Sequence, residues 1–86
     1  MEAMQAQPAP RIVRDPRILG GVPIIRGTRV PVRAIAYLWR ATGDRMRILR
    51  DYPYLAAQDV DEAIRYYEEH RPEIDADILD EQGEGD

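Results

Sequence analysis

Residues 20–43 read GGVPIIRGTRVPVRAIAYLWRATG, and the spacing of the apolar residues changes in the middle of this stretch. Before position 32, short β-branched pieces alternate with Gly and Pro, a pattern typical of short strands joined by turns. After it, apolar residues recur at i, i+3, i+4 and i+7, the spacing of one helix face. They are Val32, Ile35, Ala36 and Trp39. The stretch predicts a small β segment that leads into a helix ending at Gly43.

The β segment is expected to contain three short strands. These are Ile12-Val13, Ile24-Ile25 and Val30. Pro23 and Pro31 lack the N–H that a sheet ladder needs, so these pieces are expected at sheet edges. Gly27-Thr28 is expected to form a tight turn, because glycine readily adopts a positive φ.

Two further helices are expected downstream. Asp44 suits the N-cap of a short helix over residues 45–51, which we expect to bury Met46 and Leu49. A third helix is expected from Ala57 to about His70, with acidic residues on its outer side. Its apolar face consists of Val60, Ala63, Ile64 and Tyr67.

The sequence therefore predicts a mainly α domain with a small N-terminal β segment and three helices over residues 11–71. This outline is compatible with a helix-turn-helix core. Residues 1–10 are expected to be a disordered N-terminal tail. Residues 72–86 are expected to be an acidic C-terminal segment or tail, with 80–86 the loosest part.

Charge is divided unevenly along the chain. All 12 basic residues are Arg, and the net charge is −4. Residues 1–50 sum to +7 and residues 51–86 to −11. Such a division suggests a separate partner for each pole. The alternative is that the two ends of a small domain neutralise each other.

The composition excludes several classes of protein. With no Cys and one His, the chain has neither a disulfide framework nor a zinc site built from Cys or several His. No run approaches the about 20 apolar residues of a membrane helix, and the first ten residues do not resemble a secretion signal. We expect a cytoplasmic protein that is not an enzyme and has no cofactor, metal or membrane contact. We expect His70 to complete a helix C-terminus, where a cation complements the dipole.

Several motifs in the chain resemble a bacterial family, the domain of unknown function numbered 433. The resemblance covers roughly residues 11–67, and the Gly-Thr-Arg run beside the Tyr-Pro-x-Leu turn is its most specific part. The matching positions are Asp15-Pro16, Gly20-Gly21-Val22-Pro23, Ile25, residues 26–32, Gly43, Ile48-Leu49, Tyr52-Pro53, Leu55, Asp59-Val60 and Ala63.

The resemblance implies a homeodomain-like, helix-turn-helix fold and the function of an antitoxin in a type II toxin–antitoxin system, of the VapB type. It implies operator DNA and a cognate PIN-like ribonuclease toxin as partners. Ala56 departs from the family pattern, because similar sequences tend to place Thr or Ser before the third helix. The missing cap is expected to cost about 1 kcal/mol.

The residues favour one set of DNA contacts over another. The outer side of the third helix is acidic, so phosphates would be repelled there. We therefore expect DNA contacts from Arg, whose planar fork clasps phosphate or guanine. The candidates are Arg26, Arg29, Arg33, Arg40, Arg45, Arg47 and Arg50. The alternative is a solvated Arg face.

The acidic end of the chain suggests a toxin-binding segment. Residues 72–80 combine carboxylates with apolar residues, which suits the basic surface of an RNA-cleaving enzyme. The candidates are Ile74, Asp75, Asp77, Ile78 and Leu79. Two alternatives stay open: a plain solubilising tail, or neutralisation by an Arg that enters the acidic centre of the nuclease.

The sequence thus predicts a dimeric antitoxin that neutralises its toxin and represses its own operator. Dimerisation is expected because a core of this size seldom supplies more than about 3–5 kcal/mol. One alternative is a transcription regulator without a toxin. Another is a structural or adaptor dimer that does not bind DNA.

Overall fold

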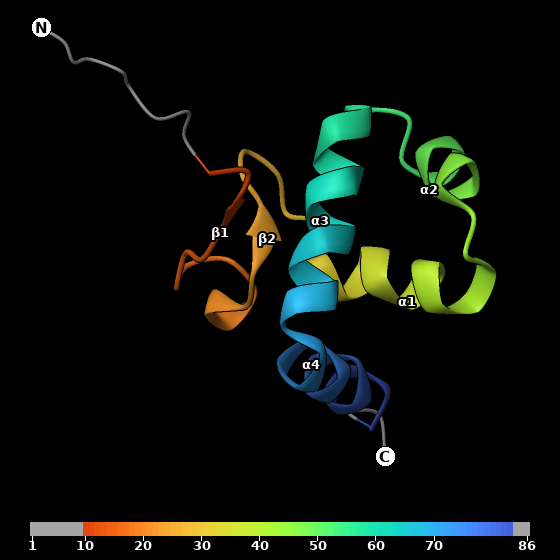
Figure 1. The fold of residues 1–86 in the computed structure, drawn as a ribbon. Helices are drawn as coiled ribbons and strands as arrows, with labels where there is room; N and C mark the ends of the chain where they lie inside the picture. The colour runs from red at the N-terminus through yellow and green to blue at the C-terminus, as the bar shows by residue number, and fades with distance from the viewer. Residues whose placement is uncertain (1–9, 84–86) are drawn as a thin grey trace, which may run out of the picture.

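The structure is a computed structural model that describes residues 10–83 (Figure 1). It is a small, mainly helical domain with four helices and one two-stranded sheet in the described part. The expected disorder of the N-terminal tail lies almost wholly outside these residues. The elements are β1 (Ile12–Val13), the 3₁₀ turn η1 (Leu19–Gly21), β2 (Ile24–Ile25), α1 (Val32–Thr42), α2 (Arg45–Asp51), α3 (Ala57–Glu69) and α4 (Arg71–Gly83).

The β segment is an antiparallel pair, and a tight turn follows its second strand. Ile12 pairs with Ile25, and Val13 with Ile24. The turn after β2 has Gly27 at φ +81°, as predicted, a conformation that costs glycine little. The Thr28 hydroxyl donates to the Ile25 carbonyl at 2.7 Å and accepts the Val30 N–H at 2.9 Å, which fixes the turn.

Helix α1 forms where the apolar period predicts it. Val32, Ile35 and Ala36 are fully buried, and Trp39 is half-buried. The helix ends at Gly43, whose φ of +61° lets its N–H reach the Trp39 carbonyl at 2.8 Å. This helix packs against α3 and α4 and is the centre of the fold.

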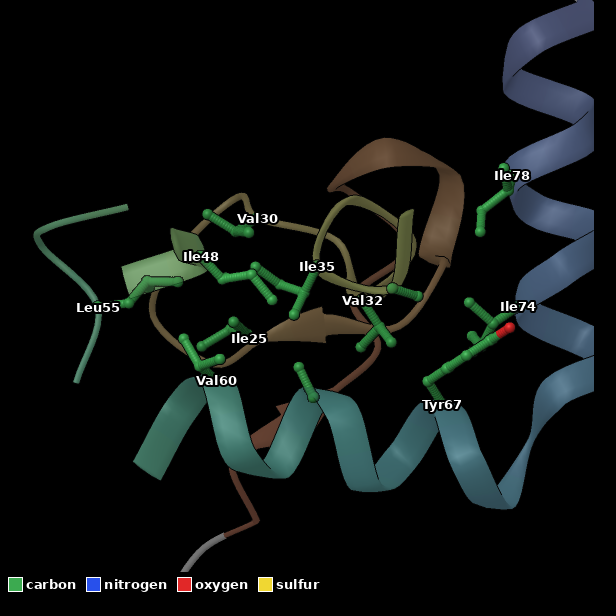
Figure 2. Close-up of a cluster of buried hydrophobic side chains, with 12 residues drawn as sticks. Ile25, Val30, Val32, Ile35, Ile48, Leu55, Val60, Tyr67, Ile74 and Ile78 are labelled. Carbon is green, nitrogen blue, oxygen red and sulfur yellow. The ribbon is translucent and has the colours of Figure 1, made fainter. Parts of the chain in front are cut away.

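Helix α2 is capped as predicted, and of the two residues expected to be buried, only Leu49 packs against the core, where it is half-buried. The Asp44 carboxylate accepts the N–H groups of Met46 and Arg47 at 3.0 and 3.2 Å. The prediction that Met46 is buried was wrong: Met46 is 60% exposed, and Ile48 is fully buried. A helix of two turns has too few apolar residues to fix its phase. Here the buried position is the one that lies among Val30, Ile35 and Leu55 (Figure 2).

Helix α3 supplies the other wall of the core with Val60, Ala63 and Tyr67. Ala56 at its N-cap has no side-chain oxygen to offer. A side chain within the helix supplies the oxygen instead, because the Asp59 carboxylate accepts the Ala56 N–H at 3.0 Å. One donor at the helix start is therefore satisfied without the missing Thr or Ser.

Helix α4 belongs to the core rather than to a separate tail. Ile74 is fully buried and Ile78 is 5% exposed, and both point toward Val32 and Tyr67 (Figure 2). The helix lies at the C-terminal end of α3 (Figure 1). This corrects the boundary expected at residue 72. It also corrects the looseness expected over residues 80–86 as far as Gly83, where the helix ends, whereas residues 84–86 lie outside the described residues. The physical reason is that two isoleucines one turn apart cover apolar surface that the other helices leave open.

Candidate nucleic-acid interface

Two of the predicted DNA-binding residues lie on the turn between β2 and α1. Arg26 and Arg29 flank Gly27 and Thr28, and both are exposed. Within the described residues, neither guanidinium forms an ion pair. The rigid turn therefore presents two free cations to solvent.

Arg50, near the C-terminal end of α2, is exposed in the same way and has no carboxylate partner in the part of the chain described. The turn and α2 lie at one end of the core, where Val30 and Ile48 are neighbours (Figure 2). Arg26, Arg29 and Arg50 are called the free arginine set below.

The other four predicted DNA-binding residues are each paired with a carboxylate. On α1, Arg33 lies 3.3 Å from Glu81 and Arg40 lies 3.3 Å from Asp75. On α2, Arg45 Nη2 donates to Asp61 Oδ2 at 3.1 Å, and Arg47 lies 3.9 Å from Asp51. These cations are partly neutralised before any partner approaches.

The two oppositely charged halves of the sequence meet in the fold. Five arginines of residues 1–50 pair with acids of α3 or α4. The pairs are Arg11–Asp59, Arg14–Glu73, Arg33–Glu81, Arg40–Asp75 and Arg45–Asp61. The expected separation into a basic and an acidic pole is therefore wrong for these positions. The alternative reading, mutual neutralisation within one domain, describes them correctly.

The outer face of α3 remains acidic, as the sequence predicts. Its charged residues are Asp61, Glu62, Arg65, Glu68 and Glu69. A hydrogen bond from Arg45 lowers the pKa of Asp61, and one from Arg71, followed by one from Trp39, lowers the pKa of Glu68. Both carboxylates stay ionised at neutral pH, which makes this face unsuited to a phosphate-lined groove.

The predicted toxin-binding residues are divided between the core and the surface. Ile74 and Ile78 are buried and cannot anchor a partner in this conformation. Asp75 accepts the Tyr67 hydroxyl at 2.9 Å. Asp77 is half-buried, and its pKa is raised by burial and then by Glu73. Leu79 is the exception, at 69% exposed.

The structure also brings together a surface that the sequence did not single out. Tyr37 on α1, Tyr52 after α2 and Ile78 on α4 line one groove. The available signal was the i, i+4, i+7 series Arg33, Tyr37 and Arg40 on the outer side of α1. The part contributed by α4 could not be predicted without the placement of that helix.

His70 lies at the end of α3, where it was expected. Its Nδ1 is 2.9 Å from the Tyr66 carbonyl, and its ring stacks on Tyr66 with centroids 4.0 Å apart. Among residues 10–83, no group of three or more His, Cys, Asp or Glu side chains is placed to hold a metal ion. No helix in the same part of the chain has the length and apolar character needed to cross a membrane.

Two known proteins are similar to this chain. The uncharacterized protein y4eO of Sinorhizobium fredii is 40% identical over 57 residues, which are 66% of this chain and 26% of that protein. The chain thus matches only about a quarter of the length of y4eO. The crystal structure of a DUF433 member protein from Anabaena variabilis superposes with a TM-score of 0.73 at 33% identity. That match covers 80% of this chain and 68% of the other.

The family match ends within the last turn of α3. The model of the family described as a protein of unknown function (DUF433) matches residues 12–67. The sheet and α1 to α3 therefore fall almost entirely within the matched region, and α4 lies beyond it. With well over half of its residues matched, this chain belongs to the DUF433 family.

Proposed function

We propose that this protein is a cytoplasmic, antitoxin-type regulator that binds operator DNA and a PIN-like ribonuclease toxin. The observation that carries the DNA-binding part is the free arginine set. Arg26, Arg29 and Arg50 are exposed and have no carboxylate partner in the described residues, whereas the other predicted contacts have one.

The distinction between free and paired arginines has an energetic meaning. Affinity for DNA comes largely from cations that displace counterions from phosphates. An arginine held by its own carboxylate must first give up that partner, and its charge is already balanced locally. The free arginine set needs no such exchange, so it supplies phosphate contacts at the least cost.

In this proposal the domain is a homeodomain-like, helix-turn-helix variant in which α3 does not enter the major groove. The acidic face of α3 favours this arrangement, because phosphates would repel Asp61, Glu62, Glu68 and Glu69. The turn between β2 and α1, together with α2, takes the place of the recognition helix. Arginine forks at these positions suit both phosphate and guanine.

Toxin binding is assigned to the acidic side of α4, at Asp77 and Asp80, rather than to its isoleucines and Leu79. Ile74 and Ile78 are held in the core, whereas Asp80 is exposed and Asp77 is half-buried. Carboxylates on this side of the helix suit the basic substrate surface of an RNA-cleaving enzyme. Co-purification with the product of the adjacent reading frame tests this part. If no partner co-purifies, the stand-alone transcription regulator replaces the antitoxin.

DNA binding is tested with two triple variants of equal charge change. The first replaces Arg26, Arg29 and Arg50 by Ala. The matched control replaces Arg17, Arg65 and Arg71, which are exposed but paired with Asp15, Glu62 or Glu69, and Glu68. Fluorescence anisotropy with a labelled promoter fragment is measured over a series of salt concentrations.

The expected result is a difference in both affinity and salt dependence. The first triple variant should lose about 100-fold or more, and its log–log salt slope should fall by about 2.7, since each phosphate contact contributes about 0.9. The control should change much less. Equal losses in the two variants would mean that net charge alone acts, and would overturn the proposed contact surface.

A second candidate is an assembly module that does not bind DNA. It is favoured by the extent of internal neutralisation, because seven of the ten arginines in residues 1–50 are in ion pairs. Wild-type protein that shows no salt-dependent shift of DNA would establish this candidate over the first.

A further inference from the structure

An open groove of about 500 Å³ runs between α1, the end of α2 and α4. Its walls combine apolar and aromatic side chains with charged groups. Among them are Arg33, Tyr37, Leu38, Tyr52, Ile78 and Glu81. Burial raises the pKa of the Tyr52 hydroxyl, which fits a wall that is already partly dehydrated. The groove is separate from the turn that carries Arg26 and Arg29.

Two smaller hollows extend the groove along the same face. One, of about 190 Å³, is lined by Tyr37, Arg40 and Ala41. The other, of about 260 Å³, shares Arg40 with the first and Ile78 with the main groove. Since Tyr37 also lines the main groove, the three hollows form one continuous surface, called the α1/α4 face below.

Apolar side chains project from this face beside its hollows. Leu79, in the wall of the hollow that it shares with Arg40, is 69% exposed, and Tyr37 is 49% exposed. Both are among the few large apolar side chains that the described chain leaves in water. A surface that packs against its own copy needs both projections and hollows, so that the projections of one copy fit the hollows of the other.

The charges on the α1/α4 face are of both signs. Arg33 and Arg40 lie 3.3 Å from Glu81 and Asp75, and Asp51 adds a further carboxylate. Arg33 is only 18% exposed, yet its buried Nε donates no hydrogen bond within the described residues. A surface with cations and anions side by side is complementary to itself about a twofold axis that lies between groups of opposite sign.

We propose that the α1/α4 face is the interface of a symmetric homodimer. The projecting Leu79 and Tyr37 of each copy fill the hollows of the other. Arg33 and Arg40 then meet carboxylates across the axis as well as within their own chain. The small core of the domain gains apolar burial that its own helices do not supply. This proposal is independent of operator binding, because association is measured on the purified chain without DNA.

The mixed charge favours a second copy over the toxin as the occupant. The basic substrate surface of an RNA-cleaving enzyme calls for a predominantly acidic complement. Arg33 and Arg40, which line the hollows of this face, would oppose such a partner. The same two arginines are needed by a twofold interface, because each copy must supply both signs.

The test measures the association state of the purified chain by sedimentation velocity over a wide concentration range. Leu79→Glu and Tyr37→Glu place a charge on the α1/α4 face at exposed positions, so folding is preserved. Met46→Glu is the matched control, because Met46 is 60% exposed on α2 and does not line the groove. Circular dichroism verifies the fold of each variant.

The wild-type chain and Met46→Glu should sediment as dimers. Leu79→Glu and Tyr37→Glu should weaken association by about 100-fold, roughly 2.8 kcal/mol. A monomeric wild type would overturn the proposal, and so would an equal loss in the Met46 control. Dimers that persist in both face variants would place the interface elsewhere and overturn it as well.

A mixing experiment tests the twofold symmetry itself. Arg40→Glu makes the face more acidic, and Glu81→Arg makes it more basic, so each variant alone should dimerise about tenfold less tightly or worse. An equimolar mixture should recover association, because each acidic face then meets a basic one. Failure of the mixture to recover would overturn the charge complementarity on which the dimer rests.

Discussion

Arg11 and Asp59 join the first strand to the start of α3, with Nη1 of the guanidinium 2.9 Å from Oδ1 of the carboxylate. The other oxygen of the same carboxylate accepts the Ala56 N–H at 3.0 Å. One side chain therefore attaches β1 to α3 and satisfies a helix N-terminus that lacks a capping residue.

The first prediction is that Asp59→Ala lowers the free energy of unfolding by about 1–2 kcal/mol, since the loss of a helix cap costs about this much. Arg11→Ala removes the half-exposed ion pair and an exposed hydrogen bond to Gln58, and should cost less than about 1 kcal/mol. Urea denaturation of both variants provides the comparison. If the two losses were equal, the ion pair rather than the cap would stabilise α3.

The second prediction concerns α4 as part of the core. Ile74 is fully buried, so Ile74→Ala should cost about 2–5 kcal/mol and Ile74→Val about 0.5–1.5 kcal/mol. Thermal and urea unfolding measure the graded loss. A chain truncated after Arg71 should be severely destabilised. Wild-type stability of that truncation would show that α4 is a dispensable tail.

The third prediction is that freeing a paired arginine strengthens DNA binding. Asp61 holds Arg45 on α2, and Asp61→Asn removes the negative charge while keeping the size of the side chain. The variant should bind the promoter fragment more tightly, with a salt slope steeper by about 0.9. Anisotropy titrations measure both quantities.

The matched control for that variant is Asp15→Asn, which frees Arg17 in the loop after β1. It makes the same change in net charge, but the arginine that it frees is not among the predicted DNA-binding residues. Equal effects of the two substitutions would argue against a localised DNA surface.

The fourth prediction is a pH-dependent gain in stability from Asp77→Asn. Burial, aided by Glu73, raises the pKa of Asp77 above its ordinary value. A carboxyl with a raised folded-state pKa costs stability as pH rises from the unfolded-state pKa through the folded one. The variant should therefore be more stable than wild type at neutral pH and should show no gain below the ordinary carboxyl range.

For Asp61→Asn we expect the opposite pH dependence of stability in the same series of measurements. Arg45 lowers the pKa of Asp61, so the stability from that pair is present above the ordinary carboxyl pKa and is lost as pH falls through the lowered value. Urea midpoints at acidic and neutral pH measure both variants. Parallel pH profiles for the two would contradict the assigned causes.

The helices that the sequence predicted best are those whose signals are local. The bounds of α2 match the prediction, and its cap at Asp44 is where the sequence places it. Helix α1 ends at Gly43, whose left-handed φ is a property of the residue itself. The start of α3 at Ala57 follows from its apolar period. Each of these signals lies within one or two turns of chain.

The features that the sequence did not predict depend on distant parts of the chain. The side of α2 that is buried depends on where Val30 and Leu55 lie. The seven residues of α2 alone could therefore not show that Ile48 is buried and Met46 is exposed. The alternation of acids and isoleucines in α4 fits an exposed segment equally well. Only the uncovered surface of α1 and α3 decides that Ile74 and Ile78 turn inward.

The candidate site shows the same division. Exposure of Arg26 and Arg29 follows from their place beside a glycine turn, which is a local property. The pairing of Arg40 with Asp75 links positions 35 residues apart and needs the packing of α1 on α4. The net charge of a segment therefore does not predict which of its arginines remain unpaired and accessible to a partner.

The inward isoleucines of α4 have a consequence for synthesis. These residues leave the ribosome after α1 to α3, and until they do, Val32 and Tyr67 lack the neighbours that cover them in the finished fold. A nascent chain that stops at residue 70 consequently exposes apolar surface to chaperones and proteases. The domain can therefore complete its core only after α4 has emerged.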